Sequence, residues 1–190
     1  MTTLRRPSSF RVERFAPERL ADFDRVHSDE RGAGWCKCVA WWVPTWDGFG
    51  ARTAEQNASL RRDLCERGEW DGLLAYDGDD AIGWCQVGPR DRLHKLASQL
   101  ALDADPHAWA VTCFLVAPHM RRRGVASALL AAAVQAARDA GARRIEGYPT
   151  VGASLHDEDA WTGTVLLFER AGFEIAVDSR PRRVVSLDLG

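Results

Sequence analysis

Residues 121–127 combine residue types that together bind anions. Three consecutive arginines precede Gly124, and an alanine-rich segment with helical spacing follows. The first turn of a helix presents backbone N–H groups that the helix itself does not use, and the helix dipole adds partial positive charge there. Gly124 and Ala126 carry almost no side chain, so a phosphate can approach these groups closely. The sequence therefore predicts a phosphate-binding loop.

This loop differs from two common phosphate-binding motifs. No Gly-Lys-Ser/Thr follows the glycine, as a P-loop requires, and one glycine stands where a dinucleotide-binding turn needs three. A solvated basic turn at the start of a core helix is the alternative interpretation of the arginines alone. The buried-looking strand before them, residues 109–116, favours the phosphate site.

The order of strand, basic loop, glycine and helix resembles the coenzyme A pyrophosphate loop of the GCN5-related N-acetyltransferases (GNAT). The family pattern Arg/Gln-x-x-Gly-x-Gly/Ala is met by Arg121, Gly124 and Ala126. A second match lies at residues 166–173, where Leu-Leu-Phe-Glu-Arg-Ala-Gly-Phe is similar to the late helix and turn of the family. From residue 111 to residue 173, the two motifs cover about a third of the chain.

The resemblance implies acetyl-CoA as co-substrate and direct acetyl transfer to an amine, without an acyl-enzyme. It implies that the strand ending at Val116 parts from the strand around Ile145, so that main-chain groups pair with the pantetheine arm. Cys113 is a conceivable nucleophile but is expected to pack in mid-strand. The cofactor-binding residues expected on this basis are Phe114, Leu115, Val116, Arg121, Arg122, Arg123, Gly124, Val125, Ala126 and Ser127.

Acyl transfer to an amine needs a base for the amine and a proton for the departing thiolate. Strand alternation puts Arg144, Glu146 and Tyr148 on one face, which makes Glu146 the candidate base and Tyr148 the candidate acid. An ion pair of Glu146 with Arg144 and simple packing of the Tyr148 ring stay open as alternatives. The tyrosine that the family often has in its late helix is Phe168 here, which has no proton to donate. Thr162, Thr164, Ser127 and water are the other donors left open.

The resemblance implies that residues 32–50 and 149–160 wall the acceptor pocket. The first segment holds Trp35, Trp41, Trp42 and Trp46, and the second holds an acidic run at residues 157–159. Aromatic faces attract cations, so such a pocket suits a cationic or aromatic amine. A tryptophan-rich small core is the equally weighted alternative.

Charge and composition exclude several other classes of protein. A net charge of −2 gives no global positive field for nucleic acid or an anionic membrane, and no apolar run has bilayer length. Cys36 and Cys38 lack a second ligand pair and the histidines form no cluster, so no metal site is predicted. Five cysteines, expected as free thiols, and the absence of a signal-peptide pattern suit the cytoplasm.

A single domain over residues 1–190 is expected to position these groups. Strands are expected at residues 10–15, 72–76, 81–87, 109–116, 143–148, 173–178 and 183–188, and helices at 17–27, 51–67, 90–100, from 125 towards Gly141, and 164–170, with an irregular segment at 32–50. With the resemblance, this order predicts an α/β GNAT-like fold. Its mixed, mostly antiparallel twisted sheet has about six or seven strands with helices on both faces.

The expected function is an N-acetyltransferase that moves an acetyl group from acetyl-CoA to a primary amine of a small molecule or peptide. The rival interpretation is an acyl-CoA-binding sensor or interaction module that keeps the loop without catalysis. A longer acyl donor is a third interpretation. A homodimer also stays open, because the sequence carries no signal of oligomeric state.

Overall fold

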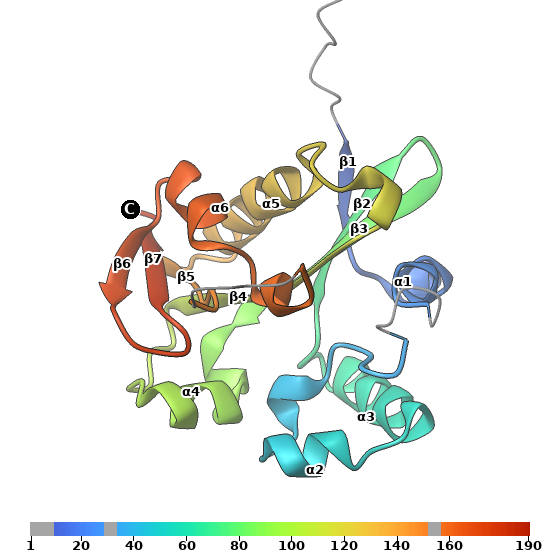
Figure 1. The fold of residues 1–190 in the computed structure, drawn as a ribbon, viewed down its shortest axis with the longest axis horizontal. Coiled ribbons are helices and arrows are strands. Elements are labelled where there is room, and N and C mark those ends of the chain that lie inside the picture. Colours follow the sequence, from blue (N-terminus) through green and yellow to red (C-terminus); the bar gives the residue numbers. More distant parts are fainter. Residues whose placement is uncertain (1–9, 29–33, 152–156) are drawn as a thin grey trace, which may run out of the picture.

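The computed structural model describes residues 10–28, 34–151 and 157–190, and its main feature is one seven-stranded sheet (Figure 1). The strand order is β1-β2-β3-β4-β5-β7-β6. The strands are β1 (Arg11–Arg14), β2 (Gly72–Asp77), β3 (Asp80–Pro89), β4 (Ala108–Val116), β5 (Arg144–Gly147), β6 (Glu174–Val177) and β7 (Val184–Asp188). The helices are α1 (Leu20–Val26), α2 (Trp46–Gly50), α3 (Ala54–Glu66), α4 (His94–Leu100), α5 (Val125–Asp139) and α6 (Val165–Arg170).

Every neighbouring pair of strands is antiparallel except β4 and β5. These two are parallel because α5 lies between them in the chain and carries it back across the sheet. The sheet type and the helices on both faces confirm the predicted fold. Gly141, with a φ of +76°, follows α5 as the sequence predicted.

Each face of the sheet has its own helices and its own apolar cluster (Figure 1). On one face, α5 packs Leu129 and Leu130 into the cluster that also holds the α6 ring Phe168. On the other face, Phe23 of α1 and Leu64 of α3 pack in the cluster around Trp84 of β3. No helix in the described parts of the chain is long and apolar enough to cross a bilayer.

Two short helical segments stand in residues 34–50, where the sequence predicted an irregular stretch. They are the 3-10 turn η3 (Ala40–Trp42) and helix α2. The Thr45 hydroxyl accepts a hydrogen bond from the Gly48 N–H at 3.0 Å and so caps the start of α2. Both segments are too short to show an apolar period, which is why the pattern did not reveal them.

The parallel pair β4 and β5 stays together for a short distance and then opens. Its register runs from Ala108↔Arg144 to Val111↔Gly147, where β5 ends. Strand β4 continues to Val116, and on its other edge it stays paired with β3 to that point. Beyond Val111, therefore, one edge of β4 is in the sheet and the other faces the opening, which we call the fork.

Phe168 of α6 fills the space beside the fork. Its ring is fully buried, with its centroid 6.2 Å from that of Phe114 and 5.1 Å from that of Phe173. Glycines flank it on two sides: a Cβ at Gly163 would lie 2.7 Å from the ring, and a Cβ at Gly147 would overlap it. The large ring fits only because these two positions carry no side chain.

We expect Gly147→Ala to lower the free energy of unfolding by about 1–3 kcal/mol, because the added methyl group overlaps the Phe168 ring. The matched control is Gly88→Ala in β3, where a Cβ would meet nothing within 4 Å. Urea unfolding of the two variants measures the difference. Equal stability of the two would contradict this account of the fork.

Candidate active site

The start of α5 has the geometry of an anion site. The helix begins behind Gly124, whose φ of +89° lies in the left-handed region that favours glycine. No side chain caps this end, so the N–H groups of Val125, Ala126 and Ser127 point out of the first turn. A Cβ at Gly124 would meet nothing within 4 Å, which leaves open space before these donors. The site therefore has both the donors and the room for a phosphate.

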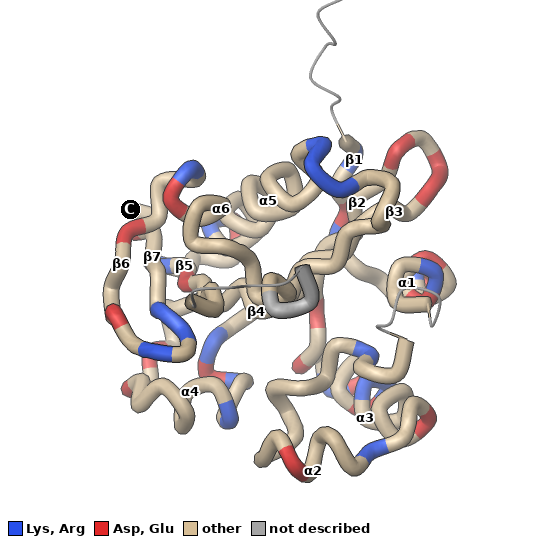
Figure 2. Tube along the Cα trace, viewed as in Figure 1, with Lys and Arg blue, Asp and Glu red and all other residues tan. Residues whose placement is uncertain are grey.

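Basic residues surround the same opening. Arg121, Arg122 and Arg123 are exposed and lie immediately before the helix, where Figure 2 shows a continuous basic stretch. The preceding strand residues Phe114, Leu115 and Val116 pair with β3 on one edge and face the fork with the other. The open edge of β4 and the start of α5 thus form consecutive parts of one main-chain surface.

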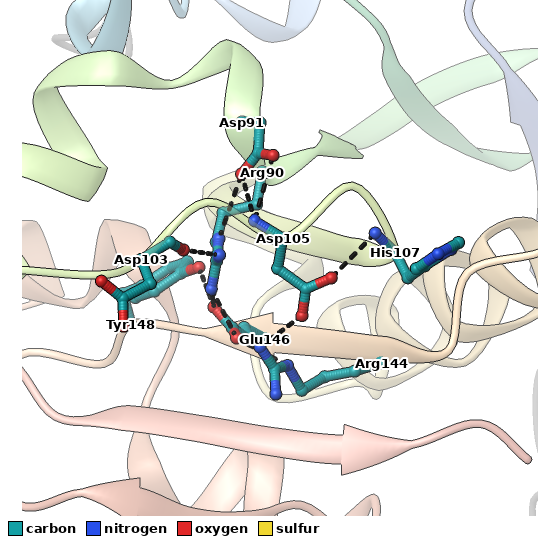
Figure 3. A network of polar contacts seen from close by, with 8 residues as sticks. All are labelled: Arg90, Asp91, Asp103, Asp105, His107, Arg144, Glu146 and Tyr148. Carbon is teal, nitrogen blue, oxygen red and sulfur yellow. Dashed lines mark hydrogen bonds and ion pairs between the residues drawn. The ribbon is translucent and has the colours of Figure 1, made fainter.

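Glu146 and Tyr148 meet in a buried polar network, as strand alternation predicted (Figure 3). The Tyr148 hydroxyl donates to Glu146 Oε2 at 2.7 Å, and the residues are 0% and 3% exposed respectively. Arg90 Nη1 donates to both carboxylate oxygens, at 3.0 and 3.2 Å. Arg144 Nε lies 2.9 Å from Oε1. The ion pair with Arg144 is therefore present, but Glu146 lies inside the protein.

These contacts limit what Glu146 can do. A carboxylate has about four lone-pair positions, and three of those of Glu146 accept hydrogen bonds, two from Arg90 and one from Tyr148. Arg144 Nε lies against the carboxylate without a hydrogen bond, so this is the contact that an amine would have to replace to give its proton to Glu146. Burial raises the pKa of Tyr148 well above its usual value, and the negative charge of Glu146 raises it further. Tyr148 thus keeps its proton, and Glu146 holds the hydroxyl in place.

Arg90 is a site residue that sequence reasoning missed. It begins the 3-10 turn η4 (Arg90–Arg92), within the helix expected at residues 90–100. An arginine in such a helix is expected to face solvent, whereas Arg90 is buried. Its side chain also donates to the carbonyl of Asp103. Burial lowers the pKa of Arg90, but the Glu146 carboxylate raises it by more, so the pKa lies above its usual value. No spacing signal links the two residues, because they meet across β4.

A cavity of about 370 Å³ borders this network. It lies between the loop at residues 101–105 and strands β6 and β7, and Arg90, Arg144 and Glu146 form part of its wall. This volume is in the range that a small molecule needs. The cavity therefore has room for a ligand beside Glu146.

The four tryptophans of the predicted acceptor wall divide between core and surface. Trp41 is 1% exposed, whereas Trp35 and Trp46 are each 38% exposed and Trp42 is half-buried. The ring centroids of Trp41 and Trp46 are 5.2 Å apart, and Trp41 packs in the same apolar cluster as Tyr148. Trp41 is therefore part of a small core, and an acceptor wall stays a prediction for the more exposed rings. The aromatic cluster has a buried part, and that part reaches the candidate catalytic tyrosine.

Two cations of the protein itself lie against these rings. Lys95 of α4 has its Nζ 3.7 Å from the centroid of Trp46, and Arg182 has its Cζ 4.9 Å from the centroid of Trp161. Contacts of this kind contribute about 0.5–2 kcal/mol each. The sequence predicted neither residue. The acidic run expected at residues 157–159 is described in its backbone and not in its side chains, so this part of the wall stays a prediction.

We expect Glu146→Gln to cost about 3 kcal/mol or more of unfolding free energy, because it removes the buried carboxylate that pairs with Arg90 and leaves that guanidinium with the longer, partly exposed contact to Asp91 at 3.7 Å. Asp105→Asn is the matched control, since it breaks an ion pair with Arg144 whose side chains are 29% and 37% exposed. That change should cost less than about 1 kcal/mol. Denaturant titration compares them, and a similar loss in both would show that the Glu146 charge is not needed in the network.

Comparison with known proteins identifies the family. The sequence profile of the acetyltransferase (GNAT) family matches residues 35–160, which is more than half of the chain. The chain therefore belongs to the GNAT family, and its enzyme class is that of the acetyltransferases. No protein among the curated sequences matches it.

Solved structures show the same fold at low sequence identity. A GNAT-family protein from Desulfovibrio desulfuricans has a TM-score of 0.60 and 18% identity, covering 95% of this chain and 99% of that chain. An acetyltransferase-like protein from Salmonella typhimurium, solved with acetyl-CoA, has a TM-score of 0.57 and 13% identity, covering 96% of this chain and 95% of that chain. PaiA N-acetyltransferase from Thermoplasma acidophilum, in complex with coenzyme A, has a TM-score of 0.56 and 11% identity, covering 95% of this chain and 99% of that chain.

Proposed function

We propose that this protein is an N-acetyltransferase that moves an acetyl group from acetyl-CoA directly to a primary amine of a small molecule or peptide. The observation that carries the proposal is the fork, because the open edge of β4 leads straight into the uncapped start of α5. Family membership and neighbours solved with acetyl-CoA or coenzyme A support it.

The residues of the fork fit this co-substrate. Phe114, Leu115 and Val116 would pair with the amide groups of the pantetheine arm as a strand does. The first-turn N–H groups of α5 and the arginines at residues 121–123 would hold the pyrophosphate. When bound there, acetyl-CoA supplies an activated thioester to the acceptor amine.

We assign Tyr148 as the group that gives its proton to the departing thiolate and Glu146 as the residue that positions its hydroxyl; Glu146 takes the proton that the acceptor amine loses and returns it to Tyr148 along their hydrogen bond. The hydrogen bond of 2.7 Å between them supports this pairing. Phe168 has no hydroxyl for the task, and it fills the fork as an apolar ring. Cys113 is buried in the apolar cluster around Trp84, which supports direct transfer without an acyl-enzyme.

The second candidate function is an acyl-CoA sensor or interaction module. Two observations favour it: Glu146 is buried and accepts three hydrogen bonds from Arg90 and Tyr148, and the late helix carries Phe168. Such a protein would bind acetyl-CoA and release no thiol with any amine. We place either protein in the cytoplasm as a single domain, supported by five free cysteines and one continuous sheet.

Gly124→Glu should weaken acetyl-CoA binding by at least about tenfold, because it places a carboxylate before the first-turn donors. Gly141→Glu controls for backbone strain and added charge, since Gly141 also has a positive φ, +76°, and open space at the other end of α5. Calorimetry on both variants gives the affinities. Unchanged affinity in Gly124→Glu would place the pyrophosphate elsewhere.

Tyr148→Phe should leave acetyl-CoA affinity unchanged and lower kcat by about 100-fold or more, because it removes the proton donor. Tyr76→Phe is the matched control: its hydroxyl also donates to a carboxylate, Asp22, at 2.9 Å, away from the fork. Thiol release with an amine panel measures the rates. A wild-type protein that binds acetyl-CoA but releases no thiol supports the sensor, and equal kcat in the two variants removes Tyr148 from the mechanism.

A further inference from the structure

Lys95 is a buried amine with no polar partner. The residue is 4% exposed, and its Nζ has no hydrogen-bond acceptor among the described residues. Three aromatic rings surround it instead, with centroids 3.7 Å (Trp46), 5.4 Å (Phe49) and 5.8 Å (Trp41) from Nζ. Burial lowers its pKa to about 8, so the amine is still mostly charged at neutral pH.

An amine in this setting lowers the stability of the fold. A buried charge is costly unless a carboxylate or hydrogen-bond acceptors balance it, and ring faces replace only part of the lost hydration. The other lysine of the chain shows the usual solution, because Lys37 Nζ lies 3.2 Å from the Asp24 carboxylate. Lys95 forms no such ion pair within the described parts of the chain.

Arg182 brings a second cation to the same aromatic cluster. It lies in the connection between β6 and β7, with its Cζ 5.7 Å from the centroid of Trp41. Its Nη1 donates to the hydroxyls of Thr150 and Thr162, which are neutral groups. Burial lowers its pKa as well, and no described carboxylate pairs with it. The cluster therefore carries two positive charges without a described counter-charge.

The cluster also reaches the candidate catalytic tyrosine. Trp41 touches both cations and packs with Leu96 and Tyr148 in one buried group. A small molecule whose amine approaches Tyr148 would thus extend towards Lys95 and Arg182. At that end the chain offers positive charge, and the ring faces that would attract a cationic acceptor already face cations of the protein.

We propose that the acceptor is a small primary amine that carries an oxyanion, such as an amino acid or an aminophosphonate, and that Lys95 binds the oxyanion, with Arg182 as the second cation near the same Trp41 ring. This proposal rests on the proposed acetyltransferase function and specifies its substrate class. It differs from the cationic acceptor expected from the tryptophans and the acidic run at residues 157–159, whose side chains the structure does not describe. Lys95 is a specificity residue here, and it takes no part in the transfer of the acetyl group.

The first test compares matched pairs of amines that differ in the oxyanion alone. Glycine, methionine, phenylalanine and 2-aminoethylphosphonate are titrated into the protein saturated with coenzyme A, beside the amides of the three amino acids and ethanolamine. We expect at least one acid to bind at least about tenfold more tightly than its neutral counterpart, and to show the higher kcat/KM in thiol release. Equal or tighter binding of the neutral compounds, or no binding of any acid, overturns the proposal.

The second test uses Lys95→Met, with Lys37→Met as the matched control. Methionine keeps the volume and removes the unpartnered amine, so we expect a Tm equal to or above that of the wild type. The same variant should lose most of the preference for acids over amides, through KM, with acetyl-CoA affinity unchanged. Lys37→Met should keep the preference. A lower Tm in Lys95→Met, or an unchanged preference, would show that Lys95 is structural.

The two proposals fail in different measurements. Calorimetry with acetyl-CoA alone tests the acetyltransferase function and does not involve Lys95. If acetyl-CoA binds and the amides are preferred, the substrate class is wrong and the enzyme assignment stands. If acetyl-CoA does not bind, the assignment of the fork is wrong, and an acid preference that depends on Lys95 would then define a separate anion site.

Discussion

The way in which the parallel pair β4 and β5 ends determines where every functional group lies. The strands hold together through Val111 and Gly147 and then part. Strand β3 keeps β4 extended beyond that point, and the Phe168 ring occupies the space against Gly147. Because β3 pairs with one edge of β4 and no described strand pairs with the other beyond Val111, the strand leads main-chain groups without a described strand partner to the start of α5. The Phe168 ring keeps the two strands apart, and the glycines at positions 147 and 163 leave space for this ring.

Burial fixes the charges around the fork. The negative charge of Glu146 is neutralised by Arg90 and Arg144, and such a buried arrangement is stable only while all partners are present. The carboxylate therefore contributes little net charge to the acceptor side and serves to hold the Tyr148 hydroxyl. The net charge of the aromatic cluster comes instead from Lys95 and Arg182. Among the described side chains the cluster is thus positive, whereas the acidic wall expected at residues 157–159 stays a prediction.

Local features were predictable from the sequence, and contacts across the sheet were not. The glycines at the two ends of α5, the hairpin turn and the strand alternation at Glu146 and Tyr148 are short-range signals, so the elements agree with expectation to within a few residues. Arg90 and Glu146 are 56 residues apart and meet only because the end of β3 lies beside β5 across β4. Lys95 meets Trp46 in the same way, because α4 packs against η3, which comes just before α2 in the chain. Periodicity places a residue on a face but does not say which side chains face it.

Under the proposed function, selectivity among amines must come from the part of the molecule that does not react. Every primary amine presents the same nucleophile to a thioester, so the groups around Tyr148 cannot separate one acceptor from another. A pair of cations removed from water, held by ring faces and neutral hydroxyls, binds an anion more strongly than the same cations would at the surface. Stability alone favours an apolar side chain at position 95, where the chain retains a lysine beside the cluster that contains Tyr148. Local choices that oppose stability are characteristic of functional sites, and here the opposing choice lies where the acceptor would have to be recognised.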